Sequence, residues 1–400
     1  MLTGRYPYRS GVIGNVYPKN EPVTRRTVRN LTMGIMGGLG VIDLREQDVV
    51  AGIPERELLL SEALKAAGYR TGMVGKWHLG DYSIDPSFNP VNNGFDSYLG
   101  VPHSNDMRPF PLYRNEEVVE KDLFGKDLSM LTGLYTEEAQ RFVRESAKAG
   151  SPFFLYFAHT FPHQPLWASE NFAGKSEGGK FGDAVEEIDW SVARIFETLA
   201  ETGVDDNTLV IFTSDNGPWF EGNAGRFRGR KGQSYEGGFR VPMIARWPGR
   251  VEAGRVCREP MMNIDFHPTF LGLAGVEEPR DRIIDGRDVL GLLTKNGVGS
   301  PHEALFFYHF DQLEGVRAGK WKYIRRMSRY TWPVPLDGRN LVDRFSRDQL
   351  GNRWPLLYNL ELDPAESYNV IDRHPDVVEK LEAIMAEEEK AMKKNPGGWL

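Results

Sequence analysis

Apolar runs of strand length alternate with amphipathic helical segments in the first half of this chain, and that alternation limits the folds it can adopt. Phe153–Ala158 is a continuous apolar run, which is typical of a strand buried on both faces. Residues 183–202 repeat their apolar side chains at helical spacing, and a strand is predicted over 208–213. Alternation of this kind predicts an α/β fold: a mainly parallel central sheet sandwiched by helices.

The segments before that run are less regular. Pro54 is expected to open a helix, and a short strand is predicted over 71–74. Residues 81–135 are rich in Pro, Asn and Gly, so we expect loops there. A further helix is expected over 136–148.

The pattern changes after residue 298. Short strands are predicted over 305–308, 315–318, 321–325 and 357–360, followed by a helix over 376–394. Gly319 and Lys320 fit a tight hairpin turn between two of these strands. We therefore predict a large domain over 1–298 and a small C-terminal α+β domain over 299–400, built from an antiparallel sheet and a helix.

Composition excludes several classes of protein. With 40% hydrophobic and 26% charged residues, the 400-residue chain resembles ordinary globular proteins. A net charge of −7 gives no reason to expect nucleic acid or an anionic membrane surface as a partner. No apolar run is long enough to span a bilayer, and a single cysteine, Cys257, allows no intrachain disulfide.

Polar side chains follow two of the predicted strands at their ends. Lys76 and His78 come just after the strand over 71–74, and His163 follows Phe153–Ala158. In an open α/β sheet these loops lie where ligands bind. A lysine and a histidine there can hold an anion and move a proton. Each residue alone is equally consistent with a surface lysine or a packed histidine.

A third strand end and a later loop add further candidates. Asp215 and Asn216 follow the strand over 208–213 and offer the hard oxygen ligands that Ca²⁺ or Mg²⁺ prefers, although the same residues also suit a plain turn. Lys231 lies in a Gly- and Arg-rich segment that could approach an anion or be a solvated basic loop. Together these groups suit cleavage of an ester with an anionic group, in which metal and lysines stabilise charge and a histidine protonates the leaving oxygen.

Nearly the whole chain resembles the type I sulfatases of the alkaline-phosphatase-like superfamily, and most closely their arylsulfatase A-like members. The segments that carry the resemblance are residues 68–80, 213–217, 231–238, 266–270 and 357–366. The resemblance implies a sulfuric ester hydrolase that acts on a small-molecule or glycan sulfate ester. It also implies a periplasmic, secreted or lysosomal location; the oligomeric state is left open.

Roles for the candidate catalytic residues follow from the resemblance. Lys76 would bind a sulfate oxygen, and His78 would orient the nucleophile and assist breakdown of the enzyme-bound sulfate. His163 and Lys231 would bind sulfate and help the leaving oxygen depart.

The resemblance also implies residues for metal and substrate binding. Asp215 and Asn216 would ligate Ca²⁺, and Ser104 would be a serine of the substrate pocket.

One departure from the family pattern is at the start of the chain. Family members carry a Cys-x-Pro-Ser-Arg motif, whose Cys or Ser becomes the formylglycine nucleophile, directly before Leu-Thr-Gly. This chain begins with Met1 and continues Leu-Thr-Gly, and Cys257 has no such motif around it. We therefore expect the domain over 1–298 to lack its first strand, its nucleophile and two early Asp ligands. Weak or absent Ca²⁺ binding and little or no activity of the chain as given are the expected consequences.

Two other functions stay open at this point. One is a phosphate-ester hydrolase of the same superfamily. The other is a non-catalytic pseudoenzyme that binds sulfated glycans through its basic pocket.

Overall fold

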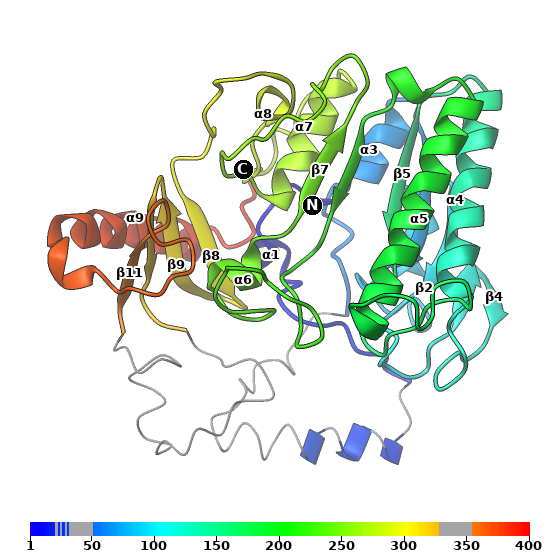
Figure 1. Cartoon of the computed structure of the whole chain (residues 1–400), viewed down its shortest axis with the longest axis horizontal. Helices are drawn as coiled ribbons and strands as arrows, with labels where there is room; N and C mark the ends of the chain where they lie inside the picture. Colours follow the sequence, from blue (N-terminus) through cyan, green and yellow to red (C-terminus); the bar gives the residue numbers. More distant parts are fainter. Residues whose placement is uncertain (21–22, 25, 29, 32–50, 328–353) are drawn as a thin grey trace.

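The structure is a computed structural model, and it describes residues 1–20, 23–24, 26–28, 30–31, 51–327 and 354–400. In Figure 1 the C-terminal part, coloured yellow to red, lies on one side, and the long helices coloured cyan to green lie on the other. The strands of these residues form a five-stranded, a four-stranded and a two-stranded sheet.

The five-stranded sheet has the order β4-β3-β2-β1-β5. Its strands are β1 (Arg70–Lys76), β2 (Ser97–Val101), β3 (Leu112–Arg114), β4 (Glu117–Glu120) and β5 (Phe153–Ala158). Strand β1 is parallel to β2 and β5, while β3 and β4 continue the sheet in antiparallel fashion. Gly75 of β1 has a φ of 106°, and a Cβ there would lie 1.8 Å from the Ala158 carbonyl oxygen. Only glycine fits this position of β1 without moving β5.

Helices cover both faces of this sheet. The helices are α3 (Leu60–Ala66), α4 (Leu131–Lys148), α5 (Gly179–Glu201) and α7 (Phe266–Leu273). Met73 of β1 belongs to the apolar cluster that includes residues of α3 and α7, whereas the next residue, Val74, belongs to the cluster that includes α4 and α5. Because successive side chains of a strand point to opposite faces, the two helix pairs lie on opposite sides of the sheet. The predicted sandwich of helices around the sheet is confirmed.

The four-stranded sheet is antiparallel and has the order β11-β10-β9-β8. Its strands are β8 (Leu305–His309), β9 (Gln312–Ala318), β10 (Trp321–Ile324) and β11 (Leu356–Asn359), and helix α9 (Pro375–Lys394) packs on it. Gly319 has a φ of 54° in the turn between β9 and β10, as the predicted hairpin requires. Leu381 and Met385 of α9 are buried against this sheet.

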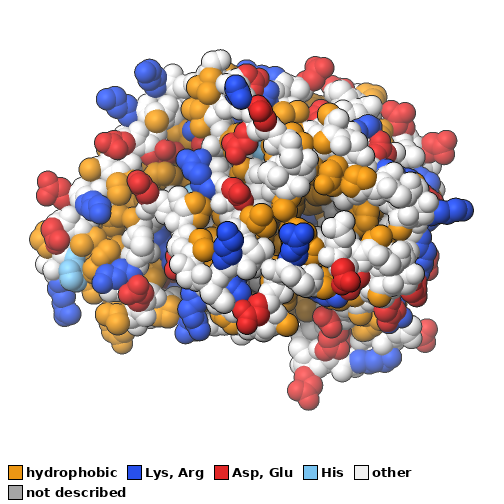
Figure 2. Space-filling model, turned by 90° about the horizontal axis from the view of Figure 1, so that it is seen from above, with side chains coloured by type: hydrophobic (Ala, Val, Ile, Leu, Met, Phe, Trp, Pro, Cys, Tyr) orange, Lys and Arg blue, Asp and Glu red, His pale blue; other side chains and the backbone are white. Residues whose placement is uncertain are grey.

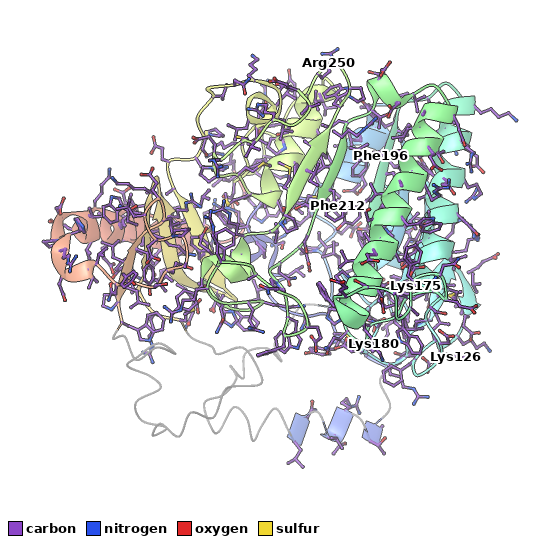
Figure 3. The ribbon with its side chains drawn as sticks, viewed as in Figure 1. Lys126, Lys175, Lys180, Phe196, Phe212 and Arg250 are labelled. Carbon is purple, nitrogen blue, oxygen red and sulfur yellow. The ribbon has the colours of Figure 1, made fainter. Side chains whose placement is uncertain are left out.

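The two-stranded ribbon pairs β6 (Val210–Thr213) with β7 (Met243–Arg246). Arg246 attaches it to the α5 side: the guanidinium forms an ion pair with Asp205 at 2.6 Å and lies 4.6 Å from the centroid of the Phe196 ring. Within the described residues, β6 pairs only with β7 and β5 only with β1. Phe212, labelled in Figure 3, and Ile244 are exposed on this ribbon.

Several elements differ from the sequence-based expectations. Every residue of β5 is half-buried, so the prediction of a strand buried on both faces was wrong; the reason is that β5 is at the edge of its sheet. Figure 2 shows the molecule from above, and hydrophobic side chains are grouped near the middle of the face seen there. The loop expected over 81–135 contains β2, β3 and β4, whose three to five residues are too few to show a periodicity.

The first helix begins later than predicted. Residue Pro54 lies in a turn, and α3 begins at Leu60. The Glu57 carboxylate is held by the Arg5 guanidinium at 2.8 Å in a fully buried ion pair, which fixes the turn. The Glu62 side chain then accepts the Leu59 N–H at 2.7 Å and caps the helix. Helix α4, in turn, starts at Leu131, five residues before the predicted start.

Other helical segments are short. They include α1 (Pro7–Ser10), α6 (Glu236–Phe239) and α8 (Leu290–Thr294), with 3₁₀ turns η2 (Pro86–Phe88), η3 (Pro90–Asn92), η4 (Asp205–Asn207), η5 (Asn263–Asp265) and η7 (Ile371–Arg373). Among the described helices, none has the length and apolar character needed to cross a membrane.

Candidate active site

The end of β1 is anchored to the end of β2. The backbone N–H groups of Trp77 and His78 donate to the carbonyls of Val101 and Pro102 at 3.0 and 2.9 Å. His78 adopts a φ of 57°, a conformation uncommon for a residue with a side chain. These bonds bring the loop that carries Lys76 and His78 beside the loop that carries Ser104.

Ser104 in turn contacts the loop after β5. Its Oγ lies 3.1 Å from Nδ1 and 3.4 Å from Nε2 of His163, and the serine is 1% exposed. Nδ1 of His163 also lies 2.7 Å from the Gln164 carbonyl oxygen, which can only accept a hydrogen bond. That contact places the proton of the neutral imidazole on Nδ1 and leaves the lone pair on Nε2.

Two close backbone contacts hold the Lys231 segment against the loop after β6. The Gly217 N–H donates to the Gly238 carbonyl at 2.9 Å, and the Lys231 N–H donates to the Pro218 carbonyl at 3.0 Å. A Cβ on Gly217 would lie 1.9 Å from the Gly237 oxygen, so this approach requires glycine. Asp215 and Asn216, two and one residues before Gly217, are thereby held next to the Lys231 segment.

The candidate side chains act on one another electrostatically. Burial lowers the pKa of Lys76, Lys231 lowers it further, and Asp215 opposes both. Burial and then Lys76 hold the pKa of His78 well below its usual 6.5. The pKa of His163 is also lowered, by burial first and then by Lys76 and Lys231. The structure therefore gathers these residues into one cationic site in which both imidazoles are neutral at pH 7 without a bound anion.

A further histidine of the site had not been singled out from the sequence. His103 is 1% exposed; its Nε2 lies 3.6 Å from Asp81 Oδ1, and its ring centroid lies 6.4 Å from that of His78. The only sequence signal for it is its place directly before Ser104. The pairing with Asp81 depends on how the loops after β1 and β2 fold together.

The residues predicted to ligate a metal do not form a complete site by themselves. Asp215 is exposed and Asn216 is half-buried. In the part of the chain that the structure describes, no group of three or more His, Cys, Asp or Glu residues could hold a metal ion. Calcium takes roughly six to eight oxygen ligands, so these two residues alone do not fit it.

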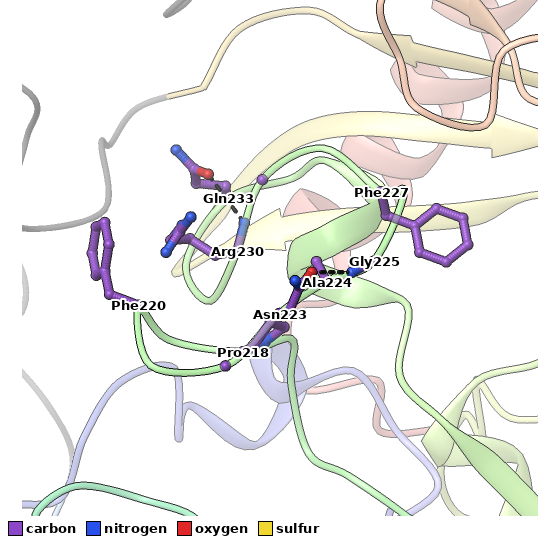
Figure 4. Close-up of a pocket in the computed structure, with 10 residues that line it drawn as sticks. Pro218, Phe220, Asn223, Ala224, Gly225, Phe227, Arg230 and Gln233 are labelled. Carbon is purple, nitrogen blue, oxygen red and sulfur yellow. Dashed lines mark hydrogen bonds between the residues drawn. The ribbon is translucent and has the colours of Figure 1, made fainter. Parts of the chain in front are cut away.

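A cavity of 360 Å³ lies next to the cationic site. The segment from Pro218 to Gln233 lines it, with Phe220, Phe227 and Arg230 among the larger side chains (Figure 4). Pro218 both lines the cavity and accepts the hydrogen bond from Lys231 N–H, so the cavity and the cationic site share one backbone wall.

Comparison with known proteins identifies relatives over the full chain. The family model described as Sulfatase matches residues 1–276, and the model described as N-sulphoglucosamine sulphohydrolase, C-terminal, matches residues 222–394. The chain is 34% identical to the N-acetylgalactosamine-6-sulfatase of Canis lupus familiaris, over 98% of this chain and 76% of that protein. It is 31% identical to the arylsulfatase A of Bos taurus, over 99% and 79%. Among solved structures, the PsFucS1 sulfatase from Pseudoalteromonas sp. matches with a TM-score of 0.79 and 25% identity, over 99% of this chain and 80% of that one.

Proposed function

The chain belongs to the sulfatase family, whose members are sulfuric ester hydrolases, and we propose that Lys76, His78, His163 and Lys231 bind the sulfate ester of a carbohydrate. One observation carries this proposal: Lys231, from a separate chain segment, lies close enough to Lys76, His78 and His163 to add to burial in lowering the pKa of all three. A bound anion would stabilise the positive charge gathered there.

Each side chain has a role that its surroundings support. The ammonium groups of Lys76 and Lys231 would donate to sulfate oxygens and stabilise the charge that develops there. Burial and the two lysines lower the pKa of His163, so a bound anion would raise it. A sulfate ester would thus favour protonation of the imidazole that must donate a proton to the leaving oxygen, while Ser104 holds the ring in place.

The nucleophile and the metal are separate parts of the proposal. The family resemblance implies a formylglycine nucleophile and Ca²⁺, and the described residues complete a site for neither. No Cys-x-Pro-Ser-Arg sequence occurs in the 400 residues, and Asp215 with Asn216 offers only part of a calcium site. We infer that these 400 residues bind sulfate esters without turning them over and bind Ca²⁺ weakly.

The carbohydrate part of the proposal has two supports. One relative is named for a sulfated amino sugar, N-acetylgalactosamine 6-sulfate. In addition, Phe220 lines the cavity beside Lys231, and the Trp219 ring packs against it with ring centroids 5.0 Å apart. Aromatic rings suit the apolar faces of sugars.

Isothermal titration calorimetry with N-acetylgalactosamine 6-sulfate and with the unsulfated sugar tests binding. We expect only the sulfated sugar to bind, and Lys76→Met to weaken it about tenfold or more because a charge-assisted hydrogen bond is lost. Lys126→Met is the matched control: Lys126 is exposed, pairs with Glu120 at 3.1 Å and lies at the edge of the molecule (Figure 3). Equal binding of both sugars, or equal losses in the two variants, would contradict the proposal.

Two further measurements separate the alternatives. Tighter binding of the sugar 6-phosphate than of the 6-sulfate would favour the phosphate-ester hydrolase. With an aryl sulfate, we expect no release of the phenol by the 400-residue chain; steady turnover would refute the proposed absence of a nucleophile.

A further inference from the structure

We propose that the cavity between Phe220 and Gln233 is a subsite for a second anionic group, a carboxylate or a sulfate, on the sugar next to the one whose ester lies at Lys231. This inference rests on the proposed function, and it names a feature of the substrate that the cationic site alone does not select. The residue that would recognise the group is Arg230.

The cavity has a cation on its wall with a defined orientation. The Arg230 guanidinium carbon lies 4.1 Å from the centroid of the Phe220 ring, and Figure 4 shows the two side chains side by side. The N–H groups of a guanidinium lie in one plane. When one face of the guanidinium stacks on a ring, these groups still point outward at its edge, where they can donate to two oxygens of a carboxylate or sulfate. The Phe220 ring therefore holds Arg230 in a form ready to bind a planar pair of oxygens.

Arg230 differs from the neighbouring arginines in its electrostatic surroundings. Arg228 donates to the Tyr358 hydroxyl and to the Glu366 carbonyl, both at 3.1 Å, and Arg240 lies 3.7 Å from the Glu236 carboxylate. Among the described residues, no carboxylate lies within ion-pair distance of the Arg230 guanidinium. A half-buried cation without a counter-ion adds a preference for a ligand with an extra negative charge.

Gln233 adds a neutral donor to the same cavity. Gln233 is 3% exposed, and its Oε1 accepts a hydrogen bond from the backbone N–H of Arg230 at 3.2 Å. Because the atom that accepts this bond must be the amide oxygen, the NH₂ group of Gln233 remains able to donate. Guanidinium and amide together suit an oxyanion better than a neutral hydroxyl.

The position of the cavity fits a group on an adjoining sugar. Arg230 and Lys231 are consecutive residues; Lys231 acts on Lys76 and His163, whereas Arg230 lines the cavity. Pro218 joins the two places through its bond to Lys231 N–H. The 360 Å³ of the cavity falls within the range of roughly 300–1,000 Å³ typical of small-ligand sites, so it can hold one substituted sugar ring.

Calorimetry on the 400-residue chain tests the subsite with three disaccharides that share N-acetylgalactosamine 6-sulfate. The second sugar is glucose, glucuronate or a sulfated glucose. We expect the two anionic disaccharides to bind about tenfold tighter than the neutral one, since a charge-assisted contact is added. In Arg230→Gln that preference should fall to about twofold or less. The glucuronate and sulfated-glucose arms show which anion the cavity takes.

Arg250→Gln is the matched control. Arg250 is an exposed arginine stacked over an aromatic ring, 5.2 Å from the centroid of Trp247, and Figure 3 places it at the opposite end of the β6–β7 ribbon from the cavity. It should keep the wild-type preference. A preference that survives in Arg230→Gln, or that is absent from the wild type while the sulfated monosaccharide binds, would overturn the subsite alone. Failure of the wild type to bind any sulfated sugar would overturn the proposed function as well.

Discussion

Lys76, which is half-buried, and Lys322, which is buried, differ in what neutralises their charge. Lys322 is 0% exposed and has two carboxylates at ion-pair distance: Glu236 at 3.0 Å and Glu366 at 3.1 Å. Lys76 has no carboxylate at that distance among the described residues, and only Asp215 and Asp106 act on it from further away.

Lys322 belongs to a structural cluster, whereas Lys76 belongs to the proposed ligand site. Burial raises the pKa of Glu236, but Lys322 and Arg317 outweigh burial and hold that pKa below its usual value. Glu366 also accepts the Glu236 backbone N–H at 2.6 Å, so the cluster joins α6 to the C-terminal sheet. A buried charge is tolerated where it is paired, as at Lys322. At Lys76, where Asp215 and Asp106 act only from further away, the proposed anion would add a partner at close range.

The largest expected effect is in the paired cluster. Lys322→Met leaves Glu236 and Glu366 buried without their cation, and we expect a loss of about 3–5 kcal/mol in the free energy of unfolding. Urea unfolding followed by circular dichroism measures it. Lys320→Met is the control, because Lys320 is exposed in the same hairpin, and it should change stability by about 0.5 kcal/mol or less. Similar losses in both variants would mean that Lys322 is not held by its carboxylates.

The next effect is a pH dependence of stability that arises in the same cluster. Burial, with Glu236 adding to it, raises the pKa of Glu366 from 4.5 to about 7. Because the folded-state pKa is the higher one, the contribution of Glu366 is fully present below pH 4.5 and is lost as the pH rises through 7. The shift corresponds to roughly 3 kcal/mol.

Glu366→Gln isolates this contribution. The amide oxygen can still accept the Glu236 N–H, but it does not titrate, so the fall in unfolding free energy between about pH 5 and pH 8 should be smaller than in the wild type. Glu236, with its lowered pKa, loses its own contribution only as the pH falls below the usual carboxyl range. Identical pH profiles for wild type and variant would exclude Glu366 as the source.

At Lys76, removal of the charge should change the free energy of unfolding in the opposite direction to Lys322→Met. Burial lowers the pKa of Lys76, so removing its charge in Lys76→Met should raise the stability of the ligand-free protein by roughly 1 kcal/mol. The same change should reduce stabilisation by sodium sulfate, which for the wild type is about 2.7 kcal/mol at one hundred times the dissociation constant. Melting curves with and without sulfate measure both effects.

Lys126→Met corrects for the general stabilising action of sulfate on folded proteins. A Lys76→Met protein that is less stable than the wild type, and that responds to sulfate like Lys126→Met, would remove the contrast between the two lysines.

The smallest effect concerns the ring of His163. Ser104→Ala removes the hydroxyl 3.1 Å from Nδ1 and should weaken binding of N-acetylgalactosamine 6-sulfate by about 1 kcal/mol or less. Calorimetry at pH 7 measures the affinity. Ser83→Ala, at a serine whose hydroxyl binds Asp81 and not a site histidine, provides the comparison and should leave the affinity nearer to that of the wild type.

Sequence patterns predicted the strand ends well, because the carboxyl ends of parallel strands meet at one edge of a sheet. That rule brought Lys76 and His163 together, and β1 and β5 are indeed parallel neighbours. The metal roles of Asp215 and Asn216 and the division at residue 298 stay predictions.

The parts that the sequence did not reveal depend on contacts between distant residues. Lys322 and Glu236 are 86 positions apart, and Arg230 owes its orientation to a ring ten residues earlier. The half-buried state of β5 follows from which strands pair, which no apolar run encodes. From the sequence, residues 326–350 are expected to form a loop that influences substrate specificity, and they lie almost wholly outside the described residues.

The bonds that hold the Lys231 segment have a consequence for biosynthesis. Glu236 meets its partner 130 residues further along the chain, and Arg228 meets Glu366 after 138. At roughly 5–20 residues per second, a ribosome needs on the order of ten seconds to make that stretch. The Lys231 segment thus gains its contacts with Glu366 only after residue 366 has emerged, well after its contacts with the loop that follows β6 can form.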